Sequence, residues 1–463
     1  MFKKILLILI GIVLVSCEKE TIDDVYNPII NNPSSNTIDD VYNPIINTPS
    51  SDTELVITQS INEIPLLGKQ WTTISQTIYN SHGNMVYEIE GERYKLLSGF
   101  GYIEESEDSH PILFKQVNNE WKYFKSFPEI GMEGVRNHRT INETTFIWAE
   151  APENDLRTCL GCPIARGGNA WLVKVIKDDV IFTKINSETN WFHDISYGDL
   201  DNDGLFDIVW NSNDVYFQNQ DGTFRLEKDI FPGTAGTVYF TIEIGDLFGD
   251  SQPEIVMGAY LDAEYDWQKR GFIVYQFNQE TRKMEEVLRK QNPLLQGDLG
   301  GNYTQIVDIN NDGYNDIVMG REGPGVEHTQ TVEIWIGNGT TDLIPYDVIG
   351  NFNKFIMVGF ELMDINNDNF LDIVFRGGGG GSIRVGTTFE EGFRLNDLIW
   401  INDGTGKFNN YISTELVGGY GTSIEKFVPY MKDGNLSFFG GLTEQLNSDY
   451  AKVTTWDIEI KNL

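Results

Sequence analysis

The sequence is poor in cysteine, in basic residues and in long apolar runs. Only three of its 463 residues are cysteine, and 34 lysines and arginines stand against 69 aspartates and glutamates. The formal charge of −35 argues against a nucleic-acid partner, because phosphates are bound mainly by lysine and arginine. The one N-terminal apolar run is too short to span a bilayer, and no second apolar run is long enough to do so.

Catalytic signatures are also lacking. The chain has no nucleophile elbow, HExxH, phosphate loop or dinucleotide fingerprint. Its five histidines form no ligand-spaced set. Carboxylates are abundant and two of them could pair for glycoside hydrolysis, but spacing alone does not show which would lie together. The sequence therefore leans away from an enzyme and leaves the question open.

The N-terminus has the order of segments found in a signal peptide. Two lysines precede an apolar run of eleven residues, Ile5–Val15. The ending LVSC resembles the lipobox of bacterial lipoproteins, so we expect residues 1–17 to be a lipoprotein signal with Cys17 lipidated. An ordinary secretory signal is the alternative. The acidic EKE that follows resembles a surface-export tag, which implies an outer-membrane lipoprotein exposed at the cell surface and held to the membrane only by its lipid.

Residues 18–52 read as a tether. They contain a near-perfect tandem duplication, Thr21–Asn36 and Thr37–Asp52, rich in Asn, Pro, Ser and Asp. Such a composition favours a flexible spacer over a packed core. The remaining residues, 53–463, are long enough to bury a large core as one all-β body.

An acidic segment, DLDNDGLFDIV from Asp199, recurs in looser form from Asp246, Asp308 and Asp364. Oxygen side chains at every second position of a turn suit calcium, which takes six to eight oxygen ligands. We expect the second copy to be degenerate, because Phe248 replaces an acid. The other copies predict three calcium sites, with one backbone carbonyl in each, formed by Asp199, Asp201, Asp203, Leu205 and Asp207; by Asp308, Asn310, Asp312, Tyr314 and Asp316; and by Asp364, Asn366, Asp368, Phe370 and Asp372.

These segments are not EF-hands. An EF-hand needs glutamate at position twelve and flanking helices, whereas position twelve here is Trp210, Met319 or Phe375. The β-branched flanks IVW, IVMG and IVF predict strands.

The repeat predicts a β-propeller. Its copies begin 47, 62 and 56 residues apart, as the starts at 199, 246, 308 and 364 show, and each unit has room for four strands. The pattern D-x-D-x-D-G-x-x-D-I-V, followed by the hairpin QNQDGTF (Gln218–Phe224), resembles the FG-GAP/VCBS repeat of integrin-α-like propellers. Degraded copies fit residues 95–130 and 140–190. We predict seven four-stranded blades, with eight as the alternative.

The C-terminal copy stops after its third strand. A propeller must pair its ends or leave an open edge. We expect Glu54–Thr58, which has strand character, to complete the last blade.

Long connections are predicted on the face opposite the acidic turns, where propellers commonly bind ligands. In them we expect a disulfide between Cys159 and Cys162. The aromatic and charged residues there suit a sugar or a peptide, although a solvated loop is the alternative. The candidate ligand-binding residues are Tyr265, Trp267, Arg270, Arg376, Arg384, Trp191 and His193.

Three functions remain open at this stage. The first is a surface lipoprotein, expected to be a monomer, whose propeller is a binding or adhesion module for glycan or protein. The second is a polysaccharide-degrading lyase or hydrolase on the same scaffold, since some polysaccharide lyases are calcium-loop propellers of similar style. The third is an envelope scaffold protein.

Overall fold

The computed structural model describes much of the chain after residue 55. The described residues are 56–67, 85–97, 110–130, 135–150, 168–186, 194–210, 214–232, 239–259, 271–295, 300–322, 330–350, 355–379, 393–394, 398–410, 416–417, 428–447 and 450–461. The predicted signal and tether and the predicted disulfide of Cys159 and Cys162 lie outside them. Within these stretches no helix has the length and apolar character needed to cross a membrane.

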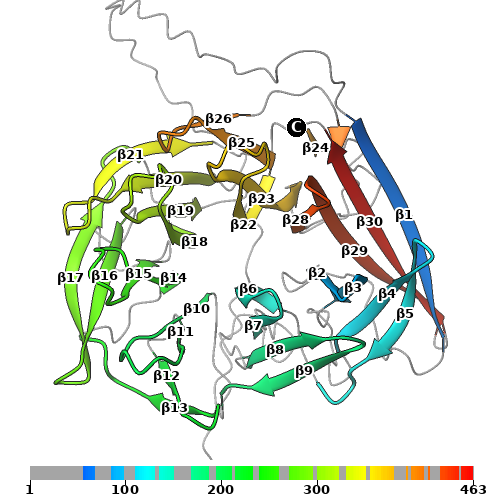
Figure 1. Ribbon diagram of the computed structural model, residues 1–463, viewed down its shortest axis with the longest axis horizontal. Helices are drawn as coiled ribbons and strands as arrows, with labels where there is room; N and C mark the ends of the chain where they lie inside the picture. The colour runs from blue at the N-terminus through cyan, green and yellow to red at the C-terminus, as the bar shows by residue number, and fades with distance from the viewer. Residues whose placement is uncertain are drawn as a thin grey trace, which may run out of the picture. The chain divides into compact units, whose positions relative to one another are not determined.

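Seven four-stranded antiparallel sheets form a ring, and we call them blades 1 to 7 (Figure 1). Blade 1 consists of β2 (Met85–Ile89), β3 (Glu92–Leu97), β4 (Ile112–Val117) and β5 (Glu120–Ser126). Blade 2 consists of β6 (Val135–Asn142), β7 (Thr145–Glu150), β8 (Ala170–Ile176) and β9 (Asp179–Lys184). Blade 3 consists of β10 (Ile195–Gly198), β11 (Asp207–Trp210), β12 (Val215–Gln218) and β13 (Phe224–Glu227).

The later blades repeat the same up-and-down order. Blade 4 consists of β14 (Tyr239–Gly245), β15 (Glu254–Ala259), β16 (Gly271–Asn278) and β17 (Lys283–Gln291). Blade 5 consists of β18 (Gly300–Val307), β19 (Asp316–Glu322), β20 (Gln330–Ile336) and β21 (Ile344–Ile349). Blade 6 consists of β22 (Phe355–Met363), β23 (Asp372–Gly379), β25 (Ile399–Asn402) and β26 (Phe408–Asn410). The predicted count of seven is confirmed.

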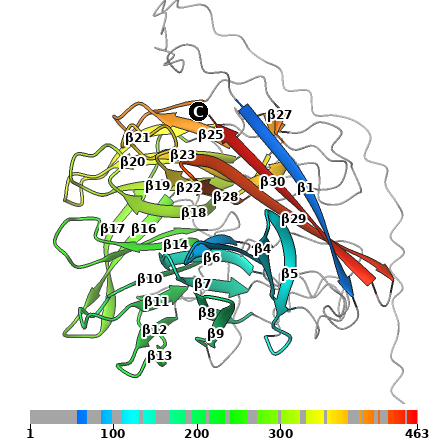
Figure 2. The same ribbon diagram turned by 45° about the vertical axis from the view of Figure 1, so that its right-hand side comes forward.

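Blade 7 closes the ring with both ends of the fold. It contains β28 (Val428–Lys432), β29 (Asn435–Asn447) and β30 (Tyr450–Lys461), and its outermost strand is β1 (Val56–Leu67). β1 runs antiparallel to β30 over its whole length (Figure 2). This confirms that a strand near the N-terminus completes the last blade, and the strand extends beyond Thr58. Pro65 is accommodated in β1 because β1 is an edge strand.

Apolar side chains fill the spaces between neighbouring sheets. The strands are rich in Val, Ile and aromatic residues, which favour a pleated, buried backbone. All four residues of β11 are buried, so both faces of this second strand are covered. Trp148 packs with blade 1 residues, Trp210 with blade 2 residues, and Trp335 with blade 4 residues. Hydrophobic burial thus holds each of these blades against its neighbour.

A buried arginine joins the inner strands of four blades. Arg139 of β6 forms an ion pair with both oxygens of Asp194 at 3.0 Å. Its other N–H groups donate to the carbonyl oxygens of Ile195, Ile242 and Thr304, which belong to blades 3, 4 and 5. Because a buried guanidinium must have every donor satisfied, its partners fix how these strands approach one another.

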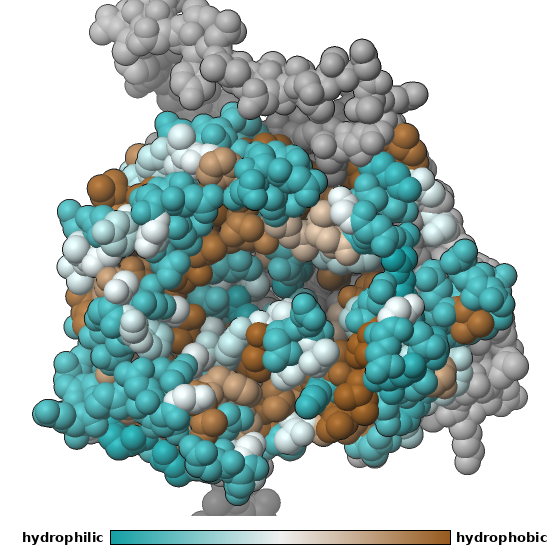
Figure 3. Space-filling model, in the orientation of Figure 1, coloured by the Kyte–Doolittle hydropathy of each residue, from teal (hydrophilic) through white to brown (hydrophobic). Residues whose placement is uncertain are grey.

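The inner strands also share a polar position that the sequence analysis missed. Three residues before the first aspartate of each acidic segment lie Ser196, Glu243, Gln305 and Glu361. The Ser196 hydroxyl donates to Glu243, and the Gln305 side-chain amide donates to the backbone oxygen of Phe360. The space-filling view shows hydrophilic residues in the hollow at the centre of the ring (Figure 3). The recurring polar residue in each entering strand was a signal that could have predicted polar contacts between the inner strands.

Removing β1 should weaken the closure of the ring. We expect a chain that begins at Gly68 to melt at least ~5 °C below one that begins at Ser51, because β30 would lose one of its two partner strands and become an exposed edge. Thermal unfolding followed by circular dichroism compares the two, and size-exclusion chromatography reports association through the exposed edge. Equal melting temperatures would show that β1 does not close the ring.

Candidate metal centre

The four acidic loops share one hydrogen-bonded framework. In blade 3, the Asp199 carboxylate accepts the N–H groups of Asp203 and Gly204, and Asp203 accepts that of Leu205. The loops of blades 4, 5 and 6 repeat these bonds from Asp246 and Asp250, Asp308 and Asp312, and Asp364 and Asp368. The alternating acids therefore shape the turn itself, before any ion is considered.

The last acid of each loop, which we call the closing acid, is Asp207, Glu254, Asp316 or Asp372. Asp207 accepts the N–H groups of Leu200, at the start of the loop, and of Gln218, at the end of β12. Asp316 and Asp372 make the corresponding bonds in blades 5 and 6, while Glu254 accepts two N–H groups within its own loop. These buried acids hold the loop against the strands that flank it.

Two positions in each loop need a left-handed backbone. In blade 6, Asn367 has φ +61° and Asn369 has φ +69°. Asn369 replaces the glycine found in blades 3 and 5, and asparagine tolerates this region better than most residues. The substitution at this position therefore keeps the turn, as expected from the sequence.

The loops differ at the third position, which holds Asp201, Phe248, Asn310 or Asn366. Asn310 and Asn366 donate to the next acid of their own loops, Asp312 and Asp368, at 3.0 and 2.9 Å. Phe248 offers no oxygen, yet the loop of blade 4 keeps the shared framework. The third position consequently changes which oxygens face the loop centre, and the fold of the loop is retained.

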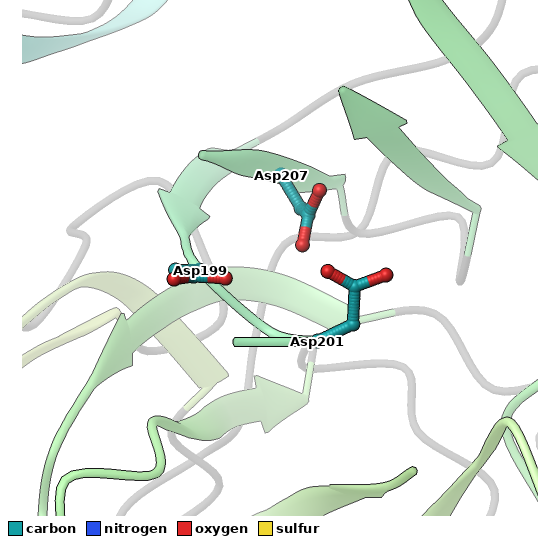
Figure 4. A group of neighbouring side chains, drawn as sticks. All are labelled: Asp199, Asp201 and Asp207. Atoms are coloured by element: carbon teal, nitrogen blue, oxygen red, sulfur yellow. The ribbon is translucent and has the colours of Figure 1, made fainter. Parts of the chain in front are cut away.

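Blade 3 brings three carboxylates together. Oxygens of Asp199, Asp201 and Asp207 lie within 4.8 Å of one another, and Figure 4 shows Asp201 and Asp207 turned toward each other. In the described part of the chain this is the single such group of histidine, cysteine and carboxylate side chains. Two oxygens bound to one calcium ion at 2.3–2.6 Å can be no more than about 5 Å apart. The cluster could therefore hold a metal ion.

A buried oxygen without a partner supports this fit. Oδ1 of Asp201 is buried and has no hydrogen-bond partner. A buried carboxylate oxygen left in this way is unfavourable unless a cation or donor meets it. The other oxygen lies 3.5 Å from Nη1 of Arg282, which comes from the β16–β17 hairpin of blade 4 and also pairs with Glu227. The arginine offsets only part of the local negative charge.

The closing acids of blades 3, 5 and 6 have raised pKa values. The pKa of Asp207 is raised to about 7, chiefly by burial and also by the charges of Asp201 and Asp203, while two backbone hydrogen bonds oppose the shift. Burial also raises the pKa of Asp316 to about 6 and that of Asp372 to about 7. A cation bound among these groups would favour their ionised forms.

Side-chain amides link neighbouring loops around this face. Gln279 of blade 4 donates to the Leu200 carbonyl of blade 3, and Asn315 of blade 5 donates to the Asp246 carbonyl of blade 4. Asn402 of blade 6 donates to the Ile309 carbonyl of blade 5. These bonds tie each of these loops to the next blade.

Of the candidate ligand-binding residues, only Arg376 lies within the described residues. It is in β23, its side chain is 3% exposed, and it forms an ion pair with Glu361. Its Nη1 lies 3.4 Å from Nδ1 of His138. A ligand carboxylate at Arg376 would have to displace Glu361. The others, Tyr265, Trp267, Arg270, Arg384, Trp191 and His193, lie outside the described residues.

The acidic loops coincide with a known repeat. Residues 199–257 and 308–375 match the model of the FG-GAP-like repeat. These two segments contain the acidic loops of blades 3, 4, 5 and 6. The chain is a seven-bladed β-propeller with FG-GAP-like repeats, as the sequence predicted.

Solved structures resemble this chain at low identity. A protein from Lactobacillus plantarum is 9% identical, with 78% of this chain and 98% of the other covered at a TM-score of 0.41. The extracellular domain assigned to a one component system of B. thetaiotaomicron is 11% identical, with coverages of 84% and 40% and a TM-score of 0.41. The periplasmic gluconolactonase of Pseudomonas aeruginosa is 9% identical, with coverages of 70% and 97% and a TM-score of 0.35. No curated protein matches the chain by sequence.

Asp201→Asn should weaken metal binding without weakening the fold of the loop. We expect about tenfold weaker calcium binding, or about 1.4 kcal/mol, since one charged ligand is lost. In chelator the variant should melt no lower than the parent, because the substitution removes one negative charge from the cluster of three carboxylates. Calorimetric titration and thermal melts measure the two effects. Asp221→Asn, an exposed acid of the β12–β13 hairpin, is the matched control. Equal calcium affinities of parent and Asp201→Asn would exclude a centre at this cluster.

The raised pKa values predict a pH dependence of the metal-free protein. Folded-state pKa values of about 7, 6 and 7 for Asp207, Asp316 and Asp372 lie above the unfolded value near 3.8. The stabilisation from these protonated acids is fully present below about pH 4 and is lost as the pH rises through 6 to 7. In chelator, the melting temperature should therefore fall between pH 5 and pH 8. Calcium should raise it more at pH 8 than at pH 5, and a calcium effect that is larger at pH 5 would contradict the assignment.

Proposed function

We propose that this protein is a calcium-stabilised β-propeller that acts as a binding module at the cell surface. Calcium is the ion that the donors favour, because the loops offer carboxylate, amide and carbonyl oxygens and no nitrogen or sulfur ligand. The strongest site is the cluster of Asp199, Asp201 and Asp207. Weaker sites would form in blades 5 and 6, where Asn310 and Asn366 replace the central acid.

The calcium ions would act as structural ligands in this proposal. They would neutralise buried acids such as Asp207 at neutral pH and brace loops that already touch the next blade. An ion that binds the folded protein and not the unfolded chain raises the free energy of unfolding. The ring would then keep its opposite face in a fixed geometry.

The observation that carries the binding function is a small sheet made by two long connections. β24 (Phe393–Arg394) lies in the connection between β23 and β25, and β27 (Leu416–Val417) lies in the connection between blades 6 and 7. The two pair antiparallel, with Phe393 opposite Val417. Because strands alternate direction within a blade, both connections leave the ring at the end opposite the acidic loops. Two long connections thus pair with each other through these short strands.

Long connections gathered on a rigid ring are a common place for recognition. That set of connections also contains the aromatic and charged candidates Trp191, His193, Tyr265, Trp267 and Arg270. Aromatic rings beside polar groups suit a glycan or a peptide. A lipid on Cys17 and the tether of residues 18–52 would attach the propeller to the outer membrane.

Binding without turnover is the expected result for the soluble chain from Ser51 onward. We expect it to be retained on at least one member of a panel of polysaccharides in calcium, with no new reducing or unsaturated ends. Trp267→Ala should weaken retention, whereas Phe124→Ala, which removes an exposed aromatic ring from β5, should not. Released sugar ends would instead identify a polysaccharide-degrading enzyme and contradict the proposal.

A further inference from the structure

A cavity of about 590 Å³ lies between blade 1 and blade 7, where the ring closes. Its walls include Trp121 of β5 and Arg93 of β3 on one side, and Tyr430 of β28 and Ser60 of β1 on the other. We call it the seam cavity. Its size falls within the range of about 300–1,000 Å³ typical of small-molecule sites. Neither the acidic loops nor the long connections described above form its walls.

The charges around the seam cavity are already paired. Nη2 of Arg93 donates to both oxygens of Asp433 at 2.9 Å, across the seam, and its Nε donates to Glu88 at 3.0 Å. Nζ of Lys432 lies 3.2 Å from Glu459. A phosphate or other strong anion would have to compete with Asp433 and Glu88 for the guanidinium. The pairing therefore favours an uncharged ligand.

The aromatic wall is held in place from inside. Nζ of the fully buried Lys95 lies 4.3 Å from the centre of the Trp121 ring and 4.4 Å from that of Phe439 in blade 7. This cation–π contact spans the seam and restrains the indole. Trp121 is half-buried, so part of its surface stays accessible. A restrained aromatic side chain binds with little loss of side-chain entropy.

The polar groups of the wall both donate and accept hydrogen bonds. Thr58, Ser60, Gln116 and Asn119 carry hydroxyl or amide groups. Ser437, another wall residue, has a buried hydroxyl without a hydrogen-bond partner. A ligand that carries many hydroxyl groups can satisfy donors and acceptors alike, and its C–H faces can lie on an aromatic ring.

We propose that the seam cavity binds a neutral, polyhydroxylated ligand with the chemistry of a saccharide unit. The inference deepens the proposed binding function and rests on it, and it places one sugar site at the closure of the ring. Because the ligand would touch blade 1 and both terminal strands of blade 7, its binding should also stabilise the closed ring.

The test compares a blocking variant with a matched control. Ser60→Trp places bulk into the seam cavity from an exposed position. Val56→Trp adds the same side chain at an exposed residue on the same side of β1 that does not form the cavity wall. Trp121→Ala removes the aromatic wall. Neutral and uronate-containing oligosaccharides are titrated into the chain from Ser51 onward, in calcium and in chelator, by calorimetry and by thermal shift. We expect Ser60→Trp and Trp121→Ala to weaken binding of the neutral sugar at least tenfold, and Val56→Trp to bind as the parent does.

The outcomes separate this inference from the proposed function. Polysaccharide retention that survives both Ser60→Trp and Trp121→Ala would overturn the seam site and leave the binding module intact. The parent chain could instead be retained on no polysaccharide and still be stabilised by neutral oligosaccharides. If Ser60→Trp abolished that stabilisation, the result would support the seam site and contradict the proposed polymer binding. Tighter binding of uronate than of neutral sugar would contradict the proposal that the ligand is uncharged. If Val56→Trp lost as much binding as Ser60→Trp, the ligand would not bind in the seam cavity.

Discussion

The ion pair of Arg139 with Asp194 is the contact on which the arrangement of the inner strands depends. Arg139 adds bonds to backbone oxygens of three further strands, so four blades meet at one guanidinium. Burial alone would lower the pKa of Arg139, but the charges of Asp194 and Glu243 outweigh burial and the pKa is raised. Removing Arg139 would leave the buried carboxylate of Asp194 without its cation, which is far more costly than losing a surface pair.

Different parts of the ring are held together by different kinds of interaction. Apolar clusters hold blades 1 to 7 together in sequence, and short polar bonds connect the acidic loops on one face. The seam between blades 7 and 1 differs in character. There a buried ammonium, Lys95, and a guanidinium, Arg93, reach toward the closing blade and a cavity remains beside them. A joint made by the two ends of the fold can be polar and open because β1 already pairs with β30 along twelve residues.

The acidic loops show that a metal-binding pattern can serve two purposes. Their carboxylates first cap N–H groups of the turn, and the loop of blade 4 keeps this framework with Phe248 in place of an acid. Only the third position decides how many oxygens face the centre. The repeat therefore preserves the loop as a structural element, and blade 3 adds the buried, unpartnered oxygen of Asp201 that suits a cation.

The sequence by itself determined the features that depend on neighbours along the chain. The spacing of Asp199 to Asp207 fixes bonds that reach at most seven residues within the turn, and the strand–turn–strand period fixes the blades. The tertiary structure alone decided that Oδ1 of Asp201 is buried without a partner while its other oxygen lies beside Arg282 of the next blade, and that Arg376 pairs with Glu361 in a strand. It also decided that Arg139 and Lys95 reach other blades, and that a cavity lies at the closing joint. Those contacts join residues far apart in the chain, so they follow from how the ring closes and leave no local pattern to read.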